Sequence, residues 1–130
     1  MSIRTFLSIA AVVAFIFGLG FVLFPAALTS LYGVSLDPVG IFIAQLEGAS
    51  LLALGIINWT SRDARDPSGI LLGNFVANAV GFIVSLFAQL NQVGGINPLG
   101  WTTVVLYLFL AVGFGYFRFI AQGTLSRVTR

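Results

Sequence analysis

Four long apolar runs alternate with short polar connections along the chain. Each run has about 20 residues, enough for an α-helix to cross roughly 30 Å of hydrocarbon. An aspartate or asparagine followed by proline precedes each of the last three runs, as expected for a helix N-cap and first turn. The pattern therefore predicts an all-α integral membrane four-helix bundle, with residues 1–130 as one transmembrane domain. The helices are expected at about residues 5–24, 39–59, 69–90 and 99–120.

Composition supports this class, because 58% of the residues are apolar and only 8% are charged. A soluble domain carries about 25% charged residues. The chain has no cysteine and no histidine, which excludes disulfides, thiol nucleophiles and Cys/His metal or haem sites. No paired acid and base or nucleophile and base stands out. We therefore expect a protein that is not an enzyme, with no catalytic residues, cofactor or metal.

The positions of the basic residues predict the orientation. All six are arginines, and the connections 25–38 and 91–98 contain none. Cytoplasmic loops are enriched in arginine and lysine, so both termini are expected in the cytoplasm of a prokaryote, with the helices in its inner membrane. A nucleic-acid-binding surface needs clustered basic residues, and these arginines are scattered, so no such surface is predicted. The residues are Arg4, Arg62, Arg65, Arg118, Arg127 and Arg130.

The segment 25–37, PAALTSLYGVSLD, is half apolar and too short to span the membrane. It predicts a short interfacial helix between the first two spans, serving as a connector on the headgroups or as a lid. Arg4 precedes the first span as in a signal peptide, but that span is longer than the usual signal core, so a retained helix is expected.

Small residues recur at every fourth position of the third predicted helix and over a shorter stretch of the first. Helices approach closely in lipid where small residues allow their backbones to meet. We therefore expect these stripes to form helix contacts, with the third helix central. The stripes are Gly69, Gly73, Ala77, Gly81 and Ser85, and Ala10, Ala14 and Gly18.

Glu47 stands near the middle of the second predicted span. It follows Asp37 by ten residues, or about 15 Å of helix. Counting from the ends of the other spans places Asn78 and Tyr107 at the same depth and Asn74 one turn away. Gln45 is close in depth but points to a different side. Depth alone leaves open whether these side chains face each other.

An intramembrane carboxyl group must be neutral, paired or hydrated. No arginine lies at its depth, so we expect a neutral Glu47 that hydrogen-bonds Asn78, Tyr107 or Ser50. Two roles remain open. Glu47 either joins helices or contacts a ligand, or it exchanges protons or cations. Asn58-Trp59-Thr60 matches a glycosylation sequon, but it falls on the predicted cytoplasmic side and is set aside.

Two segments resemble small bacterial four-helix membrane proteins of unknown function. GLGFVLFPAALTSLYGV (18–34) and AQLEGASLLALG (44–55) are similar to the DUF4345 and DoxX-like groups. Members of these groups often have an arginine or aspartate shortly before the glycine, where this chain has Gln45 and Glu47. The resemblance implies the four-helix fold and brings no catalytic residues with it.

These observations favour a non-enzymatic membrane protein that acts in helix packing, assembly or binding of a lipophilic ligand. Its expected partners are the lipid bilayer and, within it, further copies of the chain or other membrane subunits. Nucleic acid is not an expected partner. The alternative is a small proton- or cation-coupled transporter or channel that uses Glu47.

Overall fold

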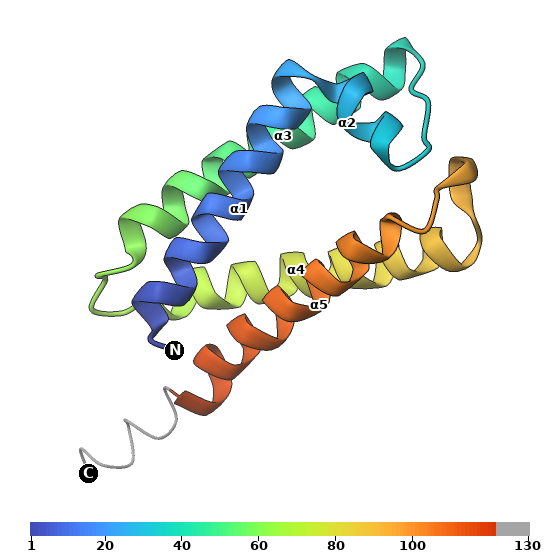
Figure 1. The fold of residues 1–130 in the computed structure, drawn as a ribbon. Helices are drawn as coiled ribbons and strands as arrows, with labels where there is room; N and C mark the ends of the chain where they lie inside the picture. Colours follow the sequence, from blue (N-terminus) through green and yellow to red (C-terminus); the bar gives the residue numbers. More distant parts are fainter. Residues whose placement is uncertain (122–130) are drawn as a thin grey trace.

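The computed structural model describes residues 1–121, which form helices joined by short connections (Figure 1). No strand occurs in this part of the chain. Arg127 and Arg130, which contributed to the predicted orientation, lie outside the described residues. The elements are α1 (Ile3–Leu23), α2 (Pro25–Leu31), α3 (Pro38–Ser61), α4 (Ser68–Leu90), the 3₁₀ helix η1 (Val93–Gly95), α5 (Gly100–Gly115) and the π-helix η2 (Tyr116–Ala121).

The described chain is all-helical, which confirms the predicted all-α class, and four of its helices are long and apolar enough to cross a membrane. They are α1, α3, α4 and the continuous helix formed by α5 and η2. The short helix expected within residues 25–37 is present as α2. The proline signals act as expected at α3, where Pro38 lies in the first turn and the Asp37 side chain accepts a hydrogen bond from the Gly40 N–H at 2.7 Å.

The helices are arranged as two antiparallel pairs, α1 with α3 and α4 with α5. The first pair crosses where two glycines meet. A Cβ atom on Gly48 would lie 2.8 Å from the carbonyl oxygen of Gly18, and one on Gly18 would lie 3.0 Å from that of Gly48. Ala10 and Ala14 of the same stripe are buried. The small residues of α1 therefore pack inside the fold, as expected.

The stripe on α4 does not form one continuous contact within the chain, contrary to the prediction. Gly81 packs against the Tyr107 ring of α5, but a Cβ atom on Gly69 or Gly73 would meet nothing within 4 Å. Gly69, Gly73 and Ala77 are all exposed. The interior face of α4 is instead the neighbouring one, where buried asparagines find hydrogen-bond partners. Small size alone did not distinguish these two faces.

An apolar core joins the two pairs at the end that holds residue 1, the connection 62–67 and η2, here named the terminal end. The Phe6 ring of α1 contacts that of Phe114 edge to face, with ring centroids 4.9 Å apart. It also covers Gly113, whose missing Cβ leaves room for it. The buried members of this core are Phe6, Leu7, Ala10, Leu71, Leu110 and Phe114.

The pairs diverge from the terminal end toward the end that holds α2 and η1, named the α2 end (Figure 1). There Asn97 connects them again. Its backbone N–H donates to the carbonyl oxygen of Tyr32 at 2.8 Å, and its side-chain Nδ2 donates to that of Leu31 at 2.9 Å. The two helix pairs are thus held together at both ends, with divergent helices between.

Candidate functional site

A cavity of about 320 Å³ lies between the two helix pairs. This volume is at the lower end of the range for small-molecule sites. All five α-helices contribute to its walls, and none of the described residues that line it carries a charge. Most of the wall is apolar, formed by side chains such as Phe17, Phe21, Leu51, Leu54, Leu106 and Leu110.

The cavity is elongated along the helix axes. On α4 its lining runs from Asn74 to Ala88, a span of about 21 Å at 1.5 Å per residue. Thr29 and Tyr32 line it at the α2 end, and Asn58 and Asn74 line it near the terminal end. Its shape therefore suits a long, narrow molecule parallel to the helices.

Asn58 of α3 and Asn74 of α4 form a reciprocal amide pair in the cavity wall near the terminal end. Nδ2 of Asn74 donates to Oδ1 of Asn58 at 2.9 Å, and Nδ2 of Asn58 donates to Oδ1 of Asn74 at 3.2 Å. Nδ2 of Asn74 also donates to the Ile70 carbonyl oxygen at 2.9 Å. Both residues are buried. The pair satisfies amides that would be costly to bury alone, and it links helices that otherwise have few contacts.

Asn78 lies one turn deeper into the cavity and is only 9% exposed. Its Nδ2 donates to the Asn74 carbonyl oxygen at 2.8 Å. Its Oδ1 accepts no hydrogen bond from the described residues. Because Asn78 lines the cavity, a group in the cavity that supplies a donor would give this oxygen a hydrogen-bond partner.

Several hydroxyl groups line the cavity, and only some of them make hydrogen bonds within the protein. Thr29 donates to the carbonyl oxygen of Pro25 and Ser85 to that of Phe82, both within their own helices. Tyr107, Tyr32 and Thr103 make no hydrogen bond through their hydroxyls within residues 1–121. Tyr107 is the nearest of these three to Asn78 in depth, because its ring packs on Gly81, three residues beyond Asn78 on α4.

Glu47 makes none of the hydrogen bonds expected from the sequence. Asn78 donates to Asn74 instead, and the Ser50 hydroxyl donates to the Leu46 carbonyl oxygen at 3.1 Å. Glu47 is exposed and has no hydrogen bond or ion pair with any described residue. It interacts electrostatically with Tyr107, but it is not among the residues that line the cavity.

The register of α3 and α4 explains this difference. These helices are antiparallel, and the Asn58–Asn74 pair aligns them. Glu47 precedes Asn58 by eleven residues, so it is level with Ser85, about 10 Å beyond Asn78 along the axis. Glu47 still shares one face of α3 with Leu51, Leu54 and Asn58, at helical spacing. It therefore lies on the cavity side of α3 and level with the lining residue Ser85, but it is exposed and is not itself part of the lining.

The other residues expected near Glu47 have different roles. The Gln45 side chain points to a different side of α3 from Glu47. Its Nε2 donates a hydrogen bond to the Val22 carbonyl oxygen of α1 at 3.3 Å. Asn74 and Asn78 belong to the cavity, together with Asn58, which the sequence showed only as part of a sequon. The signal for Asn58 was its position on the same helical face as Leu51 and Leu54.

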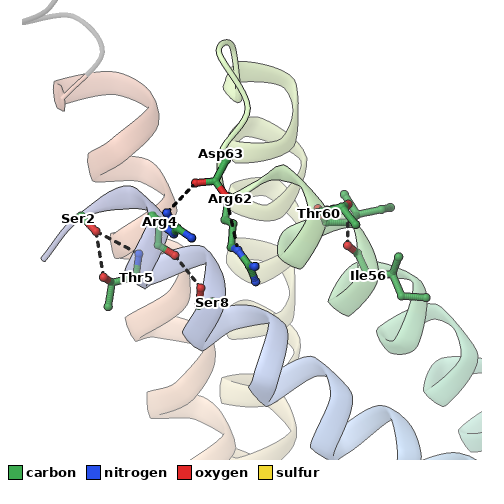
Figure 2. A network of polar contacts seen from close by, with 9 residues as sticks. Ser2, Arg4, Thr5, Ser8, Ile56, Thr60, Arg62 and Asp63 are labelled. Carbon is green, nitrogen blue, oxygen red and sulfur yellow. Dashed lines mark hydrogen bonds and ion pairs between the residues drawn. The ribbon is translucent and has the colours of Figure 1, made fainter.

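A second polar cluster covers the surface of the terminal end (Figure 2). Asp63 pairs with Arg4 at 3.3 Å and with Arg62 at 3.8 Å, and the Arg62 guanidinium lies 3.7 Å from the centroid of the Trp59 ring. Nearby, hydrogen bonds from Ser68 lower the pKa of Asp66. Arg4 and Asp63 are mostly exposed, so their ion pair adds little stability. Within residues 1–121, no group of three His, Cys, Asp or Glu side chains could hold a metal.

The described chain thus combines four helices that are long and apolar enough to cross a membrane with a cavity that no charged side chain lines. No protein-family model, curated protein or solved structure matches the chain. The resemblance to the DUF4345 and DoxX-like groups therefore stays a prediction.

Proposed function

We propose that the protein binds a lipophilic molecule in the cavity between its two helix pairs and catalyses no reaction on it. The observation that supports this most directly is the elongated, uncharged cavity lined by all five α-helices. Apolar walls with a few placed polar groups are typical of small-molecule sites. A molecule already dissolved in the bilayer could enter where the pairs diverge.

The proposal includes the expected setting of the protein. The arginines at the terminal end, Arg4, Arg62, Arg65 and Arg118, support an orientation with this end in the cytoplasm of a prokaryote and the helices in its inner membrane. Self-association stays a prediction. The exposed Gly69, Gly73 and Ala77 of α4 would suit a close helix contact in lipid, since none of residues 1–121 covers them.

The alternative of a transporter that uses Glu47 gains no specific support. Its carboxyl lies outside the cavity lining and has no hydrogen-bond partner among the described residues. A coupled site needs a path that relays the ion, and no acidic or basic side chain among the described lining residues continues such a path from Glu47.

The experiment is photolabelling of the full chain in lipid nanodiscs with a long-chain alkyl diazirine. Labelled residues are mapped by mass spectrometry. We expect labels on cavity residues near Ala88, such as Phe21 and Thr103, besides those on the lipid-facing surface. Ala88→Phe places a ring in the cavity and should remove the cavity labels only. The matched control is Ala53→Phe, on the exposed face of α3, which should keep them. Cavity labels that are missing in the wild type, or that survive in Ala88→Phe, would contradict the proposal.

A further inference from the structure

The polar groups of the cavity restrict the chemistry of its ligand. Asn78 is 9% exposed, lines the cavity and offers an amide oxygen with no donor among the described residues. The Asn78 Nδ2 donates to the Asn74 carbonyl oxygen at 2.8 Å. This hydrogen bond fixes the side chain, so its Oδ1 is an acceptor with a fixed position. A ligand that places a hydrogen-bond donor here would satisfy this oxygen. A ligand with only a carbonyl or an ester oxygen would not.

Tyr107 offers a complementary group close by. Its ring is fixed against Gly81, three residues from Asn78, so the two side chains differ in depth by about 4.5 Å. The Tyr107 hydroxyl has no hydrogen-bond partner within residues 1–121, and a phenol can donate as well as accept. One ligand hydroxyl could then donate to Asn78 and accept from Tyr107.

Charge narrows the ligand class further. Among the described residues, no Asp, Glu, Lys, Arg or His side chain lines the cavity, and Glu47 lies outside the lining. A carboxylate, phosphate or ammonium group beside Asn78 would lose its hydration without contacting a counter-ion, because Glu47 is about 10 Å farther along the axis. From Asn78 the cavity continues to Ala88, about 15 Å toward the α2 end, between walls that are mostly apolar but also carry the hydroxyl groups of Ser85, Thr103, Thr29 and Tyr32. This part suits a hydrocarbon tail.

We infer that the ligand is an uncharged long-chain alcohol, with its hydroxyl between Asn78 and Tyr107 and its chain directed toward the α2 end. This inference rests on the proposed lipophile binding and specifies its chemistry. Straight-chain and isoprenoid alcohols share this chemistry and are the two possible sources of the ligand. In the test, 1-dodecanol represents the straight-chain alcohols and farnesol the isoprenoid alcohols.

The test is competition against the photolabel in nanodiscs, with each competitor expressed as its mole fraction in the lipid. 1-Dodecanol, farnesol, dodecane, dodecanoate and dodecylammonium are compared at pH 7. We expect at least one alcohol to displace the cavity label at a mole fraction about tenfold lower than dodecane and the two ions, as one satisfied buried hydrogen bond allows. The alcohol that competes better identifies the source.

Variants locate the hydroxyl group. Asn78→Leu should abolish the preference for alcohol over dodecane, and Tyr107→Phe, which keeps the ring on Gly81, should reduce it. Asn91→Leu is the matched control, because Asn91 donates to the Phe87 carbonyl oxygen in the same way but lies outside the cavity. It should keep the full preference. If Asn78→Leu does not fold, Tyr107→Phe alone decides the test.

Three outcomes would overturn the inference while lipophile binding stands. The first is that dodecane competes as well as the alcohols, and the second is that an ion competes better than both alcohols. The third is that the preference for alcohol over dodecane is lost in Thr103→Val and retained in Tyr107→Phe. The last result would place the hydroxyl at the α2 end. A lack of any cavity label would instead reject the proposed function itself.

Discussion

Asn58 and Asn74 exchange side-chain amide hydrogen bonds across α3 and α4, at 2.9 and 3.2 Å. These two helices belong to different pairs, and they are adjacent in sequence but make few other contacts. The amide pair therefore sets their register as well as closing one end of the cavity. The arrangement of the polar residues around the cavity depends on it.

Replacing one member of this pair should cost more than replacing both. Asn58→Leu leaves the Asn74 Oδ1 buried without a donor, so we expect a loss of about 1 kcal/mol in the free energy of unfolding. Asn58→Leu combined with Asn74→Leu should recover part of this loss, since no unpaired amide then remains. Unfolding by SDS in mixed micelles measures both values. Independent, additive effects of the two substitutions would show that the pair contributes no coupling.

A second prediction concerns the close crossing of α1 and α3. Gly48→Ala places a methyl carbon 2.8 Å from the Gly18 carbonyl oxygen, which is closer than van der Waals contact allows. The helices must separate, at a cost of about 1–3 kcal/mol in the free energy of unfolding. The same micelle titration measures this cost.

Gly73→Ala is the matched control for that experiment. A Cβ atom there meets nothing within 4 Å, so the unfolding free energy of the monomer should stay unchanged or rise slightly. If Gly73→Ala destabilises the protein only where copies of the chain associate, the exposed stripe of α4 is a contact between copies. Equal effects of Gly48→Ala and Gly73→Ala would contradict the described crossing.

The contact at the α2 end should control how far the pairs diverge. Asn97→Ala removes the hydrogen bond from Nδ2 to the Leu31 carbonyl oxygen and the bond that its Oδ1 accepts from the Leu99 N–H, at 2.9 Å each. We expect a longer and broader distance distribution between the α2 and η1 segments. The chain has no native cysteine, so spin labels at Leu31→Cys and Val93→Cys report this distance by pulsed electron resonance.

Asn91→Ala serves as the control for that measurement, since Asn91 bonds only within α4 and its loss should leave the distribution unchanged. A wild-type distribution in Asn97→Ala would mean that the backbone bond to Tyr32 suffices to hold the two segments together.

Hydropathy and helix signals predicted much of this fold because both are local. The four spans, the N-cap at Asp37 and the short helix after Pro25 follow from composition and from adjacent residues. The site was harder to predict, because it depends on register between helices. Counting from helix ends placed Glu47 level with Asn78, whereas the Asn58–Asn74 pair places it level with Ser85. Which face of α4 is interior also depended on this pair.

Glu47→Gln distinguishes the two roles that the sequence left open for this residue. The carboxyl makes no hydrogen bond or ion pair within the described residues, so its replacement should change the free energy of unfolding by less than about 0.5 kcal/mol. Cavity photolabelling should also be unchanged, because Glu47 is outside the lining. In liposomes loaded with a pH-sensitive dye, wild type and Glu47→Gln should show the same proton leak. A proton flux present in the wild type and absent in Glu47→Gln would instead establish Glu47 as an ion-coupling group, and lipophile binding would then need to be linked to it.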